Sequence, residues 1–303
     1  MNSVSSLLFP LGLLLAPFLF GLINRVKAMF GGRKGRPLLQ MYFDLRKLLS
    51  KGAVYSRTTS WVFRAGPIVS LVAVLAALTL MPWAGAPALV SFDGDAILFV
   101  YLLALGRVGL ILAALDTGSA FEGMGASREA AFSTLAEPAL LLLLLALAHG
   151  TQSLSLSGMF APGGMPGENL DMAVLLLASV GLFILALLEN CRIPFDDPNT
   201  HLELTMIHEV MVLDHSGPDL ALIEFGSAVK FWALGALLMN VLVQGLAVGQ
   251  GAAAVIGLGI MFGLALAVGV VESTMARLRL TTVPRLIAMA VSCAVLSVIL
   301  VWI

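Results

Sequence analysis

The sequence predicts an all-α, polytopic integral membrane protein of about eight transmembrane helices, with one amphipathic helix lying in the membrane interface. Hydrophobic residues make up 59% of the 303 residues and charged residues 12%. That charged share is about half of what a soluble domain carries. The mean hydropathy is +1.00, and the apolar residues gather in runs of roughly 20, the length at which a helix crosses a bilayer. The formal net charge of −1 indicates no class of partner by itself.

Eight apolar runs each have the length of one crossing. We expect helices, because a lipid-exposed strand would leave backbone groups without hydrogen bonds. We expect a single membrane domain over residues 1–303 and no soluble domain. The first run has no basic n-region before it and no small-x-small cleavage site before the charged stretch that follows, so we interpret it as a retained helix rather than a signal peptide. The expected spans are Leu7–Ile23, Arg64–Trp83, Ala96–Leu115, Ser133–His149, Met172–Leu188, Ser227–Val248, Ala252–Val271 and Val283–Ile303.

Lysine and arginine gather on one side of the predicted membrane. Ten of the seventeen lie from Arg25, just after the first span, to Arg64, the first residue of the second span. The loops of the opposite side, residues 84–95, 150–171 and 247–251, hold none, and their charges are acidic. The positive-inside rule places the basic loops in the cytoplasm and, with eight spans, both termini outside. We therefore expect a multi-pass protein of a bacterial or archaeal cytoplasmic (inner) membrane.

The first basic loop contains a short amphipathic pattern after Pro37. Its spacing predicts an interfacial helix, and the alternative is a basic anchor for lipid headgroups with no site of its own. The apolar positions of this helix are Leu38, Met41, Tyr42, Leu45, Leu48 and Leu49.

Two prolines bracket two aspartates after the fifth span. Pro194 and Pro198 enclose Asp196 and Asp197, so the span is expected to end sharply at the membrane edge. A new helix is expected to start from Asp197 or Asn199 as its N-cap. Such a break places polar backbone at membrane depth, which is tolerated where protein buries it.

Carboxylates within or beside membrane spans are costly and usually functional. Glu137 and Glu189 adjoin long apolar runs, so each needs a partner, a water chain or a proton. Arg107 and Lys230 are candidate partners, although Lys230 also suits a position at the headgroups. Glu122 is expected in the short loop after the third span. The other acids of this set are Asp116 and Glu272 at span ends and Glu203, Glu209, Asp214, Asp219 and Glu224 in the loop before the sixth span.

The sequence carries no pattern of a metal or catalytic site. His201, His208 and His215 are seven residues apart, which is ~10 Å along a helix and too far for one shared metal ion. Cys191 and Cys293 form no CxxC motif, so they cannot hold an iron–sulfur cluster. No nucleophile–base pair, phosphate loop or nucleotide site is present, and we expect no nucleic-acid partner. The residues alone thus indicate a membrane protein with a buried acidic path and a large basic docking face.

Three stretches of the chain resemble one family: the membrane anchor shared by respiratory complex I, where it is the H subunit of NADH-quinone oxidoreductase, and the energy-converting membrane-bound [NiFe] hydrogenases. The stretches are Leu38-Leu39-Gln40 with Asp44 and Lys47-Leu48, Phe121–Glu129 with Glu137-Pro138, and Glu189 with Arg192 and Pro194-Phe195-Asp196. Asp196-Asp197-Pro198 and Thr200–Met211 are more similar to the hydrogenase branch, as in formate hydrogenlyase subunit 4 and hydrogenase-4 component C.

The resemblance implies a non-catalytic subunit of an oxidoreductase complex that binds no metal or other cofactor itself. In that family the [NiFe] centre and the iron–sulfur clusters belong to partner subunits. The implied partners are the [NiFe]-hydrogenase large and small subunits, an iron–sulfur protein and antiporter-like membrane subunits, assembled as a hetero-oligomer in the lipid bilayer.

The resemblance also assigns roles to individual residues. The proton (or sodium) path implied for this chain consists of Glu137, Glu189, Glu203, Glu224, Glu272 and Glu122. The implied junction with the redox arm consists of Arg33, Arg36, Gln40, Asp44, Arg128, Arg192, Asp196 and Asp197.

Three alternative functions remain open from the sequence. The first is the quinone-site H subunit of a complex I-type NADH-quinone oxidoreductase. The second is a stand-alone secondary transporter, although such proteins often show inverted repeats and broken mid-membrane helices. The third is a structural anchor with solvated acids.

Overall fold

The computed structural model describes residues 3–161, 171–196, 206–244, 246 and 250–302. Eight of its helices are long and apolar enough to cross a membrane, which confirms the predicted all-α polytopic fold. These are α1 (Ser3–Phe30), α3 (Trp61–Thr79), α4 (Asp95–Asp116), α5 (Ala120–Thr151), α7 (Met172–Glu189), α9 (Gly217–Gln244), α10 (Gln250–Thr274) and α11 (Val283–Trp302). The shorter helices are α2 (Gln40–Leu49), α6 (Leu156–Met159) and α8 (His208–Met211).

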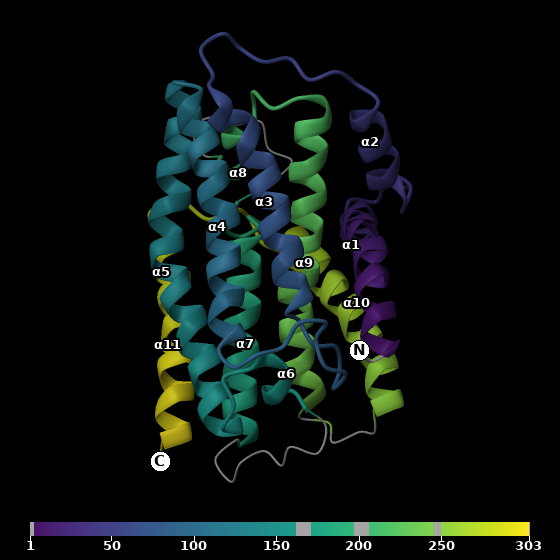
Figure 1. Cartoon of the computed structure of the whole chain (residues 1–303), viewed down its shortest axis with the longest axis vertical. Helices are drawn as coiled ribbons and strands as arrows, with labels where there is room; N and C mark the ends of the chain where they lie inside the picture. The colour runs from purple at the N-terminus through teal and green to yellow at the C-terminus, as the bar shows by residue number, and fades with distance from the viewer. Residues whose placement is uncertain (1–2, 162–170, 197–205, 245, 247–249, 303) are drawn as a thin grey trace.

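The long helices form one elongated bundle around α9 (Figure 1). α9 packs against α1, α2, α3, α7 and α10. It is also the most enclosed span. In its apolar stretch 78% of the residues are buried inside the protein, whereas in α10 and in α11 this share is 33%. Because apolar side chains are as stable in lipid as in a protein core, the outer helices can leave theirs exposed. α9 is thus the axis on which the other elements are placed.

Both ends of the chain lie toward the same end of the bundle, opposite the loop that joins α2 to α3 (Figure 1). An even number of crossings requires this arrangement. The basic residues of the α1–α3 connection and the acidic residues of the α3–α4 connection therefore lie at opposite ends of the molecule.

Two spans begin well before the apolar runs that predicted them. α5 begins at Ala120 rather than near Ser133, and α9 begins at Gly217 rather than near Ser227. The predicted loop positions of Glu122, Asp219 and Glu224 are therefore wrong, because all three lie on helices. The first turns of both helices are polar but packed inside the bundle, so a count of apolar residues alone does not detect them.

The predicted interfacial helix is present as α2, which packs on α9 and α1. Met41 packs against the main core. Leu39, Phe43 and Leu49 are exposed on the outer side. A short helix with apolar residues on its outer face suits the boundary between headgroups and acyl chains. α2 thereby forms one wall of the polar region described below.

Small residues allow α3 and α4 to approach each other closely. A Cβ atom placed on Gly66 of α3 would lie 2.6 Å from the Ala113 Cβ and 2.8 Å from the Gly109 carbonyl oxygen of α4. Such small-residue contacts are a common basis of helix association in membranes. The contact fixes α4, and with it Arg107, against the rest of the bundle.

Gly66→Ala is expected to destabilise the protein by about 1–3 kcal/mol, because the added methyl group overpacks the α3–α4 contact. The measurement is the thermal unfolding midpoint in detergent. Gly259→Ala on α10 is the matched control, since its Cβ would meet nothing within 4 Å. Equal midpoints for the two variants would contradict the proposed close contact.

Candidate functional site

The polar centre of the molecule begins where α7 ends. After Glu189 the chain continues as a buried turn, Asn190–Asp196, instead of a further helical turn. Hydrogen bonds from the Arg192 amide to the Leu187 carbonyl and from the Phe195 amide to the Arg192 carbonyl close this turn. Farther along, α8 packs beside the first turns of α5 (Figure 1). The described part of the proline-bracketed segment, up to Asp196, therefore turns inside the protein.

Arg107 of α4 binds three carboxylates within the bundle. Its Nη1 lies 2.5 Å from Glu137 Oε1, and its Nη2 contacts both carboxylate oxygens of Glu189. Its Nε lies 3.4 Å from Glu129 Oε1. The Arg107 side chain is 6% exposed and the Glu189 side chain 4%, whereas the Glu137 side chain is 34% exposed. We call these four residues the Arg107 cluster.

The Arg107 cluster confirms the predicted pairing of Arg107 with acids, and it contains one acid, Glu129, that was not predicted as a site residue. Arg107 pairs with intramembrane acids as predicted, and it joins the partly exposed Glu137 of α5 to the buried Glu189 of α7. Glu129 belongs to a stretch that carries the family resemblance, but it is not among the predicted path residues. The signal that could have identified it is its spacing of eight residues from Glu137, which places both on one face of α5.

A second group of charges surrounds Glu272 of α10. The Glu272 carboxylate lies 2.7 Å from Lys27 Nζ of α1 and 3.3 Å from Arg192 Nη1. The Arg192 guanidinium also lies over the Phe20 ring, 4.0 Å from its centroid. Arg192 is therefore fixed by an acid and an aromatic ring from two different helices.

Asp196 organises the end of the buried turn. Its Oδ1 lies 2.9 Å from Arg277 Nη2. Its Oδ2 accepts hydrogen bonds of 3.0 Å from the amides of Ile207 and His208 at the start of α8. Arg128 of α5 donates to the Met206 carbonyl at 2.9 Å. Buried charges of this kind are stable when each has several partners, so the turn and α8 form one fixed unit.

A cleft of about 280 Å³ lies between α1, α2, the buried turn and α9. Gln40 donates to Asp44 at 2.8 Å on its α2 wall. Burial, together with the positive charges of Lys230 and Arg192, lowers the pKa of His208 to about 4, so its imidazole is neutral near pH 7. The polar residues that line the cleft are Asn24, Arg36, Gln40, Asp44, Asn190, Cys191, Arg192, Asp196, His208, Glu209, Glu224 and Ser227.

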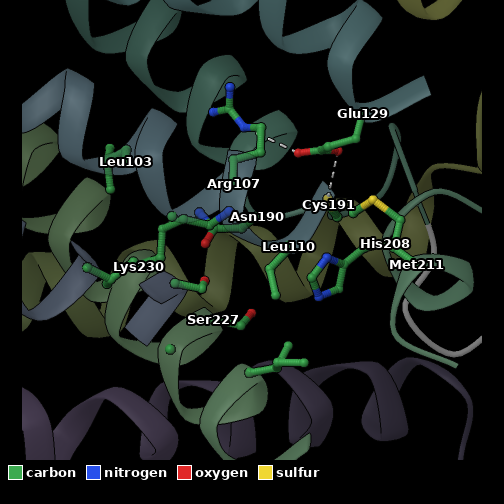
Figure 2. Close-up of a pocket in the computed structure, with 15 residues that line it drawn as sticks. Leu103, Arg107, Leu110, Glu129, Asn190, Cys191, His208, Met211, Ser227 and Lys230 are labelled. Atoms are coloured by element: carbon green, nitrogen blue, oxygen red, sulfur yellow. Dashed lines mark hydrogen bonds and ion pairs between the residues drawn. The ribbon is translucent and has the colours of Figure 1, made fainter. Parts of the chain in front are cut away.

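A smaller cavity of about 30 Å³ lies deeper, beside Arg107 and Lys230. Figure 2 shows Glu129 joined by dashed lines to Arg107 and to Cys191. Burial, followed by the negative charge of Glu129, raises the pKa of the Cys191 thiol well above its ordinary value. The thiol is thus protonated, and its Sγ lies 3.7 Å from Glu129 Oε2 as a weak donor. The inner cavity and the cleft share Asn190, Cys191, His208 and Ser227 as lining residues.

The predicted path residues fall into separate places. Glu137 and Glu189 meet at Arg107, Glu272 lies in its own group with Lys27 and Arg192, and Glu224 lines the cleft. Glu122 is buried at the start of α5, where its Oε1 accepts a hydrogen bond of 3.1 Å from the Asp214 amide. Glu203 lies outside the described residues.

The predicted junction residues divide into an outer and an inner set. Arg33, Arg36, Gln40 and Asp44 lie on the α1–α2 connection and on α2, and both arginines are exposed. Arg192 and Asp196 are buried, with 6% and 1% exposure. Asp197 falls outside the part of the chain that the structure describes, as does the helix predicted to begin at Asp197 or Asn199.

Two of the three spaced histidines have separate surroundings. His208 lines the cleft, whereas His215 stacks on Phe63 with ring centroids 4.0 Å apart. Within the described ranges, no group of three or more His, Cys, Asp or Glu side chains is placed to hold a metal ion. His201 lies in the segment that is not described.

The chain is similar in sequence to several known proteins. Residues 3–303 match a family described as NADH dehydrogenase. Hydrogenase-4 component C of Escherichia coli (strain K12) is 34% identical over 227 residues, covering 72% of this chain and 68% of that protein. Formate hydrogenlyase subunit 4 of the same strain is 31% identical over 282 residues, covering 89% of each. The H subunit of NADH-quinone oxidoreductase from Paraburkholderia phymatum is 26% identical and covers 66% of this chain and 58% of that protein.

One solved structure shares the fold along almost the whole chain. It is a chain of the membrane-bound sulfane sulfur reductase, an archaeal respiratory membrane complex, with a TM-score of 0.83 and 20% identity. The match covers 98% of both chains. At this identity the likeness is one of fold.

Arg107→Gln is expected to destabilise the protein by about 3–5 kcal/mol, because it removes the cation shared by three carboxylates. A thermal unfolding midpoint in detergent measures the loss. Arg64→Gln is the control, since Arg64 is an exposed arginine over the Tyr55 ring. If the two variants unfold at the same temperature, Arg107 does not hold the cluster together.

Proposed function

Because the chain belongs to the NADH dehydrogenase family, within the group that contains the H subunit of complex I, we propose that it anchors a cytoplasmic [NiFe]-hydrogenase arm and gives that arm a carboxylate path into the membrane. The chain is a multi-pass membrane subunit of a membrane-bound hydrogenase or complex I-like complex. Two relatives, 34% and 31% identical to this chain, are named hydrogenase-4 component C and formate hydrogenlyase subunit 4. Their names support the hydrogenase branch for this chain.

The Arg107 cluster is the single observation that carries the proposed path. One guanidinium joins Glu189, enclosed at the end of α7, to Glu137, whose side chain is 34% exposed on α5. A carboxylate can give up its contact with an arginine and bind a proton instead, with little movement of the side chain. A row of such carboxylates can therefore transfer a proton from one to the next. Glu137 provides the exit of the path at the side of the bundle, toward a neighbouring antiporter-like membrane subunit.

The cleft provides the other end of the path. Glu224 lines it together with Asp44 of α2, and Asn190 and Cys191 separate it from the Arg107 cluster. Glu272 joins the path through Arg192, which binds Glu272 and also lines the cleft. Glu122 and Glu203 remain assignments from the family resemblance. The transported ion is a proton or a sodium ion.

The basic face around α2 provides the anchor. Arg33 and Arg36 are exposed there, beside Gln40 and Asp44. We propose that these residues contact the redox arm directly. Arg192, Asp196 and Arg128 support the junction indirectly, because they hold the buried turn and α8 in place inside the bundle. The basic loops then face the cytoplasm and both termini lie outside.

The partners in this proposal supply the redox chemistry. The [NiFe] centre and the iron–sulfur clusters belong to the hydrogenase large and small subunits and an iron–sulfur protein. The role of this chain is to hold and transfer protons that respond to charge changes in the arm, and it carries no electrons itself.

One observation favours a second candidate, the quinone-site subunit of a complex I-type enzyme. The cleft adjoins the interfacial helix α2 and is lined by apolar side chains, Met41, Leu45 and Leu48, as well as polar ones. Such a mixed lining suits an amphiphilic ligand. Quinone-dependent electron transfer that is sensitive to site inhibitors would favour this candidate over the hydrogenase proposal.

Glu137→Gln and Glu189→Gln, each made in the whole purified complex, are expected to reduce proton translocation per hydrogen evolved by about tenfold or more. Glutamine keeps the side-chain size but cannot carry the proton. The measurement is internal acidification of proteoliposomes during hydrogen evolution. Asp93→Asn is the control, because Asp93 is an exposed acid in the α3–α4 connection. Unchanged coupling in both glutamate variants would exclude the proton-path role.

Arg33→Glu is expected to weaken attachment of the redox arm, because it reverses one exposed charge of the basic face. The fraction of hydrogenase subunits that co-purify with this chain should fall, and fall further at high salt. Asp93→Lys, a charge reversal at the other end of the bundle, should leave this fraction unchanged. Equal retention in both variants would contradict an arm junction at Arg33.

A further inference from the structure

The inner cavity shares four lining residues with the cleft and is also lined by Arg107 and Glu129, and its wall is polar on several sides. Glu129, Asn190 and Lys230 face it from α5, the buried turn and α9 (Figure 2). Its volume of about 30 Å³ exceeds the ~10–15 Å³ that a single water needs. A cavity of this size with both donors and acceptors in its wall is suited to ordered water.

Asn190 provides independent support for a bound water. Asn190 is 6% exposed. Its Nδ2 donates to the Ala186 carbonyl at 2.7 Å. Its Oδ1 is buried and has no hydrogen-bond partner among the described residues. Leaving a buried acceptor unpaired is unfavourable, and a water in the adjacent cavity removes that cost.

The charges of the Arg107 cluster and of the neighbouring Lys230 do not balance. Arg107 of α4 and Lys230 of α9 supply two positive charges, and Glu129, Glu137 and Glu189 supply up to three negative ones. The other titratable groups that line the cavity are neutral: the His208 imidazole, whose pKa is about 4, and the Cys191 thiol. A buried net charge is unfavourable, so one added proton makes the group neutral.

Of the three acids in the Arg107 cluster, Glu129 makes the weakest contact with the Arg107 guanidinium. Its Oε1 lies 3.4 Å from Arg107 Nε, whereas Glu137 lies at 2.5 Å and Glu189 contacts the guanidinium with both oxygens. The other Glu129 oxygen faces the Cys191 thiol, which is a weak donor. Glu129 is therefore the acid of the cluster best placed to hold the added proton.

We propose that the inner cavity is a water site and that Glu129 is the proton-carrying group through which that water connects the cleft with the Arg107 cluster. The inference rests on the proposed function and deepens it. A proton from the cleft passes by the Ser227 hydroxyl and the cavity water to a Glu129 carboxylate oxygen. It then leaves Glu129 for Glu137 or Glu189 as Arg107 shifts its contacts, and no electron moves.

The first test is Glu129→Gln in the whole complex. Proton translocation per hydrogen evolved is expected to fall by about tenfold or more, as for Glu137→Gln. The infrared spectrum supplies a readout that a merely structural role would not change. The complex should lose one protonated-carboxyl band that shifts in D2O, and Glu137→Gln should retain that band.

The second test removes the water but keeps every carboxylate. Ser227→Val places a methyl group where a hydroxyl now lines the cavity and is expected to lower coupling as Glu129→Gln does. Ser179→Val on α7 is the matched control, because its hydroxyl bonds only within its own helix in the described structure, to the Leu175 carbonyl. It should leave coupling unchanged. Co-purification of all subunits shows that each variant is assembled.

The outcomes separate this inference from the proposed function. If Glu129→Gln and Ser227→Val retain normal coupling while Glu137→Gln and Glu189→Gln lose it, the path exists but does not pass through the inner cavity. If all four variants retain coupling, the proposed function itself is overturned. Persistence of the protonated-carboxyl band in Glu129→Gln would also refute the inference.

Discussion

The sharing of one guanidinium by three carboxylates is the constraint on which the rest of this structure depends. Charges inside a bundle are stable only with close partners, and Arg107 supplies that partner to acids from α5 and from the end of α7. α3 and α4 must therefore pack at small residues, so that Arg107 is presented at the correct depth. α7 must also stop at Glu189, so that its last carboxylate meets the guanidinium.

The end of α7 creates a second requirement, because a helix that stops inside a membrane protein exposes backbone groups. The buried turn satisfies several of them through its own hydrogen bonds, and Asp196 binds two amides of the following segment. Arg192 and Arg277 balance the nearby acids. The same groups leave two cavities that share four lining residues. Interrupting one helix thus produces both the charged cluster and the polar route that leads to it.

The sequence predicted what depends on local pattern. Apolar length located all eight spans, periodicity located α2, and the cost of an intramembrane acid identified Glu137 and Glu189. The pairing of these acids through Arg107 crosses 30 and 82 residues of chain, and no local pattern contains such contacts. The contact of Glu129 with Arg107 is equally distant in sequence, although its spacing of eight residues from Glu137 was a local signal that went unused. The starts of α5 and α9 were missed because burial, rather than composition, keeps their polar turns helical.

The partial exposure of Glu137 has a consequence for how the protein exists in a cell. Its carboxyl group lies on a flank where an isolated chain would present it to hydrocarbon, which strongly disfavours charge. A neighbouring subunit that covers this flank removes the penalty. The side of the bundle at Glu137 is therefore best satisfied when another subunit of the complex covers it.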